Sequence, residues 1–150
     1  KDISTKVVDC DKPLPFENDS YGGVIFINAL YTLKDRESFV KEVFRVLKPG
    51  GIFISISPFI ANEMPEPHDY CRLTHEGLSE LMSVNRWVSV RITRIGERFS
   101  ASANLLHPAM LFTLVRVIVY GLALILDKVI PKRVTDRHPA PLGYTITAIK

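Results

Sequence analysis

The chain has 150 residues, of which 47% are hydrophobic and 23% charged, and this apolar content suits a single globular domain. Its net charge of +3 comes from interspersed residues of both signs without a long Lys/Arg run, which argues against nucleic acid as a partner. The two cysteines, Cys10 and Cys71, lack metal-ligand spacing, and the first residues do not resemble a signal peptide. We therefore expect no metal and a cytoplasmic setting.

The beginning of the chain predicts two strands joined by a loop. Residues 7–9 are a short β-branched run that ends on an acid, and a polar loop with two prolines follows. Residues 23–27 are then continuously apolar, which is typical of a strand buried on both faces of a parallel sheet. Asn28 ends that run with a polar group.

A helix and a further strand complete a βαβ unit. Asp35 is a suitable N-cap for a helix that begins at Arg36, because apolar residues then recur at helical spacing. The Lys-Pro-Gly-Gly segment at 48–51 ends the helix, since proline cannot continue the ladder and glycine tolerates a reversal. An apolar strand at 52–57 follows at once.

The second half of the chain predicts a helix and two half-exposed strands. After a loop rich in Pro, Glu and His, a helix is expected over 74–82, with Thr74 at its start. Residues 88–95 and 144–149 both alternate with period two, as half-exposed strands do. We treat residues 1–150 as one partial domain with a hydrophobic helical insertion at about 105–130.

The most hydrophobic stretch, 109–126, has Arg116 as its only charge and is close to the minimum length for a bilayer span. Three interpretations remain open: a helix or hairpin that packs on protein, an interfacial helix, and a transmembrane span. A central arginine makes the span the least favoured of the three. Downstream basic residues such as Lys128 and Lys132 would suit an anionic membrane surface, so a peripheral membrane contact through 109–126 is retained.

The order of three motifs resembles one known family. The sequence Asp-Cys-Asp-Lys-Pro-Leu-Pro-Phe begins at Asp9, an apolar strand follows it, and Arg-Val-Leu-Lys-Pro-Gly-Gly ends at Gly51. This pattern is similar to the middle of class I S-adenosylmethionine-dependent methyltransferases of the type 11 group. The resemblance implies a Rossmann-like α/β sheet with parallel strands and a C-terminal antiparallel pair. It also implies S-adenosylmethionine as cofactor and methyl transfer to a small-molecule acceptor.

The resemblance also assigns cofactor-binding positions. The acid and the residue after it, here Asp9 and Cys10, would meet the adenine, and the residues after the next strand, here Asn28, Ala29 and Leu30, would lie near the methionine part. Open α/β sheets bind ligands beyond the carboxyl ends of their strands, which is where these residues are expected. A solvated loop acid at Asp9 and a turn residue at Asn28 are the alternative interpretations.

Several departures from the family pattern bear on function. The Gly-rich loop after the first strand and the ribose-binding acid after the second have no counterpart in the sequence, and Tyr31-Thr32 stands where a Glu-His pair is common. We therefore expect an N-terminally truncated domain that is inactive by itself. In the family's strand order, the missing strands would leave the edge of strand 23–27 open, so we expect residues 3–9 to pair there, or two chains to associate, or the protein to aggregate.

A second group of candidate residues lies downstream. His68, Tyr70 and Arg72 precede the predicted helix at 74–82, and similar patterns lie on the substrate side of some of these enzymes. His68 would be the base for a hydroxyl acceptor, and Tyr70 and Arg72 would orient the acceptor. In the alternative interpretation, Tyr70 and Arg72 hold a loop over the core and His68 is exposed. Two rival functions remain open for the chain: a non-catalytic interaction module and a membrane-peripheral module.

Overall fold

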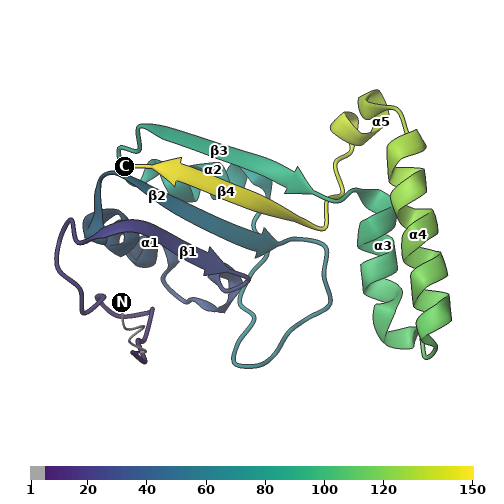
Figure 1. The fold of residues 1–150 in the computed structure, drawn as a ribbon, viewed down its shortest axis with the longest axis horizontal. Coiled ribbons are helices and arrows are strands. Elements are labelled where there is room, and N and C mark those ends of the chain that lie inside the picture. The colour runs from purple at the N-terminus through teal and green to yellow at the C-terminus, as the bar shows by residue number, and fades with distance from the viewer. Residues whose placement is uncertain (1–5) are drawn as a thin grey trace.

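A mixed four-stranded sheet forms the centre of the structure, a computed structural model that describes residues 6–150 (Figure 1). The strands are β1 (Tyr21–Ile27), β2 (Leu47–Pro58), β3 (Ser89–Ile95) and β4 (Gly143–Ile149). Their spatial order is β1-β2-β4-β3, with β1 parallel to β2 and with β4 antiparallel to both β2 and β3. The predicted parallel strands and the C-terminal antiparallel pair are confirmed.

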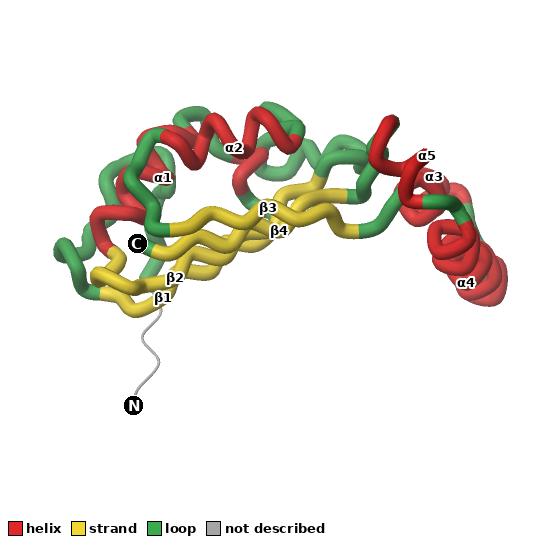
Figure 2. The backbone as a smooth tube through the Cα atoms, turned by 90° about the horizontal axis from the view of Figure 1, so that it is seen from above, coloured by secondary structure: helices red, strands yellow, loops and turns green. Residues whose placement is uncertain are grey.

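Two helices, α1 (Arg36–Val46) and α2 (His75–Ser83), cover one face of this sheet (Figure 2). Strand side chains alternate between faces, so every second residue of β2 and β4 meets the helices. The resulting core joins both helices to the sheet and includes Leu30, Leu33, Phe39, Val40, Val43, Leu47, Phe53, Leu78, Met82, Tyr144, Ile146 and Ala148.

Both helices begin where the sequence predicts. The Asp35 side chain accepts a hydrogen bond from the Ser38 amide at 2.9 Å, and Thr74 Oγ1 accepts one from the Gly77 amide at 3.2 Å. These bonds satisfy amide groups that have no partner within a first helical turn. The α1 helix ends at Val46, and β2 begins at Leu47, so the predicted Lys-Pro-Gly-Gly terminator belongs to the extended strand.

Replacing Thr74 with alanine is expected to lower the free energy of unfolding by about 1 kcal/mol, because the first turn of α2 loses its side-chain cap. Urea denaturation followed by circular dichroism measures this effect. Thr74→Ser is the matched control, since it keeps the hydroxyl and should stay near the wild-type value. Equal stability of the alanine and serine variants would contradict a capping role.

The predicted strand at 7–9 is wrong. Residues 6–9 have no regular structure, and the Val7 side chain is fully exposed. The segment that follows is held on α1 instead: the Leu14 amide donates to Glu42 Oε2 at 2.7 Å, and the Arg45 guanidinium donates to the carbonyls of Phe16 and Leu14. Two exposed valines with no strand beside them among the described residues bury little apolar surface and form no inter-strand hydrogen bonds. They therefore lack the free energy that would hold the segment as a strand.

The outer edge of β1 therefore pairs with no strand among residues 6–150. The prediction that the N-terminal segment crosses to pair with it is wrong for residues 6–9, and residues 3–5 lie outside the described part. Self-association at this edge stays a prediction. The sheet face opposite α1 and α2 is also open, and Ile25, Ile27 and Ile52 expose 68%, 54% and 42% of their surface there.

The hydrophobic stretch forms part of a helical hairpin beyond the end of the sheet (Figure 1). The hairpin consists of α3 (Arg98–Leu106) and α4 (Thr113–Val129), with a short α5 (Lys132–Arg137) after them. The α4 helix packs along α3, so the expected helix that lies partly on protein is observed. Within the described residues, every helix is too short or too polar to cross a bilayer.

Candidate functional site

The first part of the candidate site is the turn that ends β1. Asn28 adopts a left-handed backbone with φ of 50°, a conformation that asparagine tolerates better than most residues, and its amide donates to the Ile56 carbonyl at 2.9 Å. The chain thus leaves the sheet at the carboxyl ends of β1 and β2. The Asn28 side chain is exposed there, as a ligand-binding group at this edge must be.

The next residues turn back into the core. Ala29 precedes the 3₁₀ turn η1 (Leu30–Thr32), and its carbonyl accepts hydrogen bonds from the amide and the hydroxyl of Thr32. Leu30 is 1% exposed, so its side chain supports the turn from within. Of the three residues predicted near the methionine part of a cofactor, Asn28 offers a side chain, whereas Leu30 offers only backbone groups.

The second part of the site is the loop that carries Asp9 and Cys10. Asp11 attaches this loop to the segment after η1, because its Oδ1 atom accepts from the amides of Lys34 at 2.9 Å and Asp35 at 3.3 Å. Cys10 packs against the core cluster. The Asp9–Cys10 loop is therefore attached to the segment between η1 and α1, with Cys10 on the core cluster that contains Leu30, and Asp11 is the attaching residue that sequence reasoning missed.

Asp9 is an exposed carboxylate with local partners. Its Oδ1 accepts from the Asp11 amide at 3.1 Å, and its Oδ2 lies 3.1 Å from the Lys12 ammonium. The Lys12 hydrogen bond and then the Asp11 amide lower the pKa of Asp9 below its usual value, so the group is charged at neutral pH. Partial burial raises the pKa of the Cys10 thiol and keeps it protonated.

A cavity of about 290 Å³ opens at the carboxyl ends of the parallel strands. Its wall combines Asn28 from the β1 turn, Ile56 and Ser57 from β2, Met64 from the following loop and Asn104 from α3. Amide and hydroxyl groups therefore face a largely apolar space, which is the usual character of a small-molecule site. Ser57 and Asn104 were not predicted, although the place of Ser57 at the end of a buried strand was a usable signal.

The third part of the site is the loop between β2 and α2. Here Asp69 and Arg72 form a two-pronged ion pair, with one N–O distance of 2.5 Å, and the Met64 amide donates to Asp69 at 2.9 Å. The Arg72 guanidinium also lies 4.8 Å from the centre of the Tyr31 ring. These contacts fasten the loop to η1, and the Arg72 hydrogen bond is the main reason that the pKa of Asp69 is lowered.

His68 and Tyr70 lie on the outside of the same loop. Their ring centres are 5.3 Å apart, and Tyr70 is 43% exposed, while its amide donates to the Tyr31 carbonyl at 2.9 Å. The structure thus brings His68 and Tyr70 together, whereas Arg72 is engaged in its ion pair with Asp69. This is the geometry of the loop-holding alternative, and a role for these three residues toward an acceptor stays a prediction.

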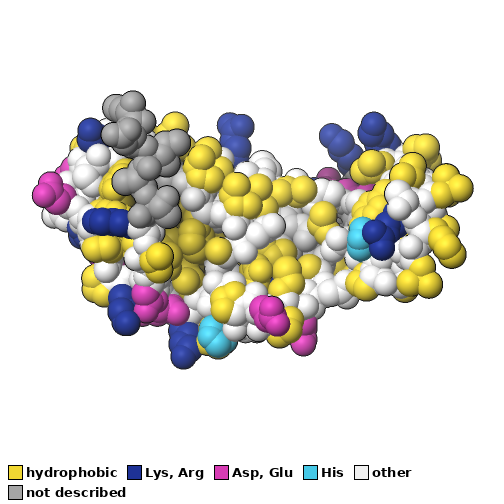
Figure 3. Space-filling model, turned by 60° about the horizontal axis from the view of Figure 1, so that its bottom comes forward, with side chains coloured by type: hydrophobic (Ala, Val, Ile, Leu, Met, Phe, Trp, Pro, Cys, Tyr) yellow, Lys and Arg dark blue, Asp and Glu magenta, His cyan; other side chains and the backbone are white. Residues whose placement is uncertain are grey.

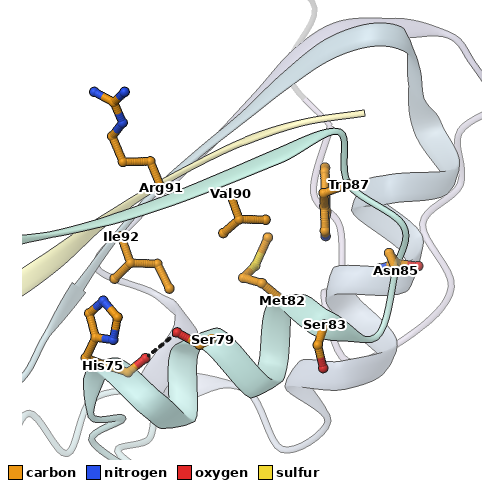
Figure 4. Close-up of a pocket in the computed structure, with 9 residues that line it drawn as sticks. All are labelled: His75, Ser79, Met82, Ser83, Asn85, Trp87, Val90, Arg91 and Ile92. Carbon is orange, nitrogen blue, oxygen red and sulfur yellow. Dashed lines mark hydrogen bonds between the residues drawn. The ribbon is translucent and has the colours of Figure 1, made fainter.

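Larger hollows lie away from this edge. One of about 520 Å³ separates α2 from β3, where Val90 and Ile92 point toward Met82 and Arg91 points to the other side of the strand (Figure 4). The hydrogen bond drawn there, Ser79 Oγ to the His75 carbonyl at 2.9 Å, is internal to the helix. The lining of the hollow mixes apolar side chains with polar ones such as His75, Ser83 and Asn85. Within residues 6–150, no three His, Cys, Asp or Glu side chains are placed to hold a metal ion.

Comparison with known proteins agrees with this architecture. The sequence of residues 1–55 matches a family model described as a methyltransferase domain. Geranyl diphosphate C-methyltransferase from Streptomyces coelicolor superposes on 96% of the chain with a TM-score of 0.60 and 14% identity. The chain has the class I methyltransferase fold.

Two further structures show how far the likeness reaches. Phosphoethanolamine N-methyltransferase 2 from Haemonchus contortus, solved with S-adenosyl-L-methionine, matches 95% of the chain with a TM-score of 0.58 and 14% identity. The [4+2]-cyclase SpnF matches 97% with a TM-score of 0.52 and 19% identity. The chain covers 52%, 36% and 56% of these three structures in the order given, so it spans between about a third and just over half of their length. Among curated proteins, none matches the sequence.

Proposed function

We propose that the protein transfers the methyl group of S-adenosylmethionine to a small-molecule acceptor. The observation that carries the proposal is that the Asp9–Cys10 loop lies against the chain that follows β1: Asp11 accepts from the Lys34 and Asp35 amides, and Cys10 packs on the core cluster that contains Leu30. The match of residues 1–55 to a methyltransferase domain supports it. The presence of a cyclase among the structural neighbours shows that the fold alone does not decide the reaction.

The residues present suit the adenine and methionine ends of this cofactor. Asp9 is a charged, exposed carboxylate that can accept from an exocyclic amine, and the exposed Asn28 amide borders the cavity at the strand ends. When bound, the cofactor supplies an electrophilic methyl group on a sulfonium. Bound here, it would give that methyl group to the acceptor's nucleophile and leave as the thioether, so the residues of the chain would have to hold the two molecules in line.

The contribution of the chain to this step is positioning and, for a protic acceptor, removal of a proton. His68 is the proposed base, with Tyr70 beside it as an orienting group. Arg72 is a positioning residue in this proposal, because its ion pair with Asp69 holds the loop that carries both rings. The mixed apolar and amide wall of the cavity favours an acceptor that is small and partly apolar.

A non-catalytic interaction module is the second candidate. It is favoured by the downstream loop, where Asp69 and Arg72 satisfy each other and His68 is exposed rather than placed in the cavity. Such a module would retain the sheet without binding the cofactor. Cofactor binding therefore separates the two candidates.

Replacing Asp9 with asparagine in the full-length protein is expected to raise the dissociation constant for S-adenosylmethionine by about tenfold, because a charge-assisted hydrogen bond to the adenine amine becomes a neutral one. Isothermal titration measures this change. Glu17→Gln is the matched control, since Glu17 is also an exposed acid on the N-terminal segment. Unchanged affinity in Asp9→Asn would make Asp9 a solvated loop residue, and wild-type protein that binds no cofactor would favour the interaction module.

A further inference from the structure

The α4 helix has its polar and apolar sides reversed relative to a water-exposed helix. Six outward-facing residues in and beside it, all large and apolar, expose between 59% and 82% of their surface: Leu111, Phe112, Leu114, Val117, Ile125 and Val129. A helix on the surface of a soluble protein normally turns such residues inward. Figure 3 shows hydrophobic side chains covering much of the hairpin at the right-hand end of the molecule.

Three polar residues of the same helix contact α3 or the connection between α3 and α4. Asp127 accepts from the amides of Phe99 and Ser100 at 2.8 and 3.0 Å and so caps α3, and the Tyr120 hydroxyl lies 3.2 Å from His107 Nδ1. Arg116 Nε donates to the Met110 carbonyl at 2.8 Å. These contacts fix the rotation of α4, so the apolar face cannot turn inward without breaking them.

The charges around the hairpin select a negatively charged partner. Both acids within residues 98–137 already have partners. Asp127 caps the start of α3, and Asp136 forms an ion pair with Arg94. In contrast, Lys128, Lys132 and Arg133 are exposed and form no salt bridge within the described residues. Basic side chains lie at the edge of the hairpin in Figure 3. An apolar face bordered by free cations is the pattern of helices that lie in a membrane interface.

The composition and length of α4 favour lipid over a protein partner. The outward residues within α4 are aliphatic, with Phe112 just before it, whereas the residues that dominate protein interfaces are Trp, Tyr and Arg. A helix of 17 residues is about 25 Å long, shorter than the hydrocarbon core of a bilayer. We propose that α4 lies in the plane of an anionic membrane surface, with its outward face among the acyl chains and with Lys128, Lys132 and Arg133 against lipid phosphates.

Flotation of the purified full-length protein with vesicles tests this proposal, because bound protein floats while aggregates sediment. The protein is expected to float with vesicles of phosphatidylcholine and phosphatidylserine. The double variant Val117→Glu/Ile125→Glu should lose at least tenfold in partitioning, since two side chains no longer enter the apolar layer. The matched control is Val7→Glu/Val88→Glu, which changes two exposed valines far from α4 in sequence and should bind like the wild type.

A charge variant separates the lipid phosphates from simple hydrophobic adsorption. Lys132→Gln/Arg133→Gln should lower binding to the anionic vesicles by about fivefold per residue at low salt and leave binding to pure phosphatidylcholine unchanged. Because these side chains are exposed, folding is preserved, and circular dichroism of each variant checks it. Equal flotation of wild type and the Val117→Glu/Ile125→Glu variant would overturn the proposal. The proposal would also be overturned if the wild-type protein did not float with vesicles and instead formed a dimer that the Val117→Glu/Ile125→Glu variant dissociates.

Discussion

Replacing Phe53 with alanine is expected to lower the free energy of unfolding by about 3–5 kcal/mol. Phe53 lies in the central strand β2, is fully buried, and stacks on Trp87 with ring centres 6.1 Å apart. Its removal leaves a cavity between the sheet and both covering helices, and such a loss is a large part of the total stability of a domain. Urea denaturation followed by circular dichroism gives the value.

The matched control is Phe112→Ala, at a phenylalanine that is 72% exposed. In the absence of lipid, this variant should unfold within about 0.5 kcal/mol of the wild type, because no packed contact is lost. A loss of less than 1 kcal/mol in Phe53→Ala would mean that the sheet and the helices do not form one core.

Replacing Asp69 with alanine is expected to cost about 2 kcal/mol at neutral pH, because the Arg72 guanidinium loses its main partner in a largely buried position. The change should also loosen the loop that carries His68 and Tyr70. Limited proteolysis is expected to cut the variant faster within residues 60–73, and thermal denaturation measures the loss of stability. Asp19→Ala is the control, since its ion pair with Lys150 is more exposed.

The effect of Asp69 depends on pH in a defined direction. Arg72 lowers the pKa of Asp69 in the folded state, so the pair contributes fully above the ordinary carboxyl pKa of about 4. That contribution is lost as the pH falls through the lowered pKa. The difference in stability between wild type and Asp69→Ala should therefore shrink below about pH 4. A difference that stays constant into strong acid would contradict the ion-pair origin.

Most elements of the fold could be predicted from local sequence patterns. The caps at Asp35 and Thr74, the helical spacing of α1 and the alternation of β3 and β4 each follow from interactions within a few residues, and the structure confirms them. Residues 7–9 have the composition of a strand but no neighbouring strand among residues 6–150, and pairing is a property of the whole sheet. The prediction of a strand at residues 7–9 is therefore wrong.

The candidate site was less predictable because it depends on segments that are distant in sequence. Asp9 and Asn28 could be named from the resemblance, yet the bonds that hold the Asp9 loop are donated to Asp11 by the amides of Lys34 and Asp35, several residues beyond Asn28. Likewise, the string from His68 to Arg72 gave no sign that Arg72 would pair with Asp69 and cover the Tyr31 ring. Nothing in the spacing of Asn104 indicated that α3 would border the cavity at the strand ends.

The position of β4 has a consequence for the order in which the protein can fold as it is synthesised. Gly143–Ile149 lies between β2 and β3, and within residues 6–150 β3 has no other strand as neighbour. When synthesis has reached Arg137, both helices of the hairpin have been made, while β3 still lacks the strand with which it pairs. The sheet therefore closes only after residues 143–149 have been made, and the exposed α4 helix, which precedes them in the chain, leaves the ribosome before the sheet is complete.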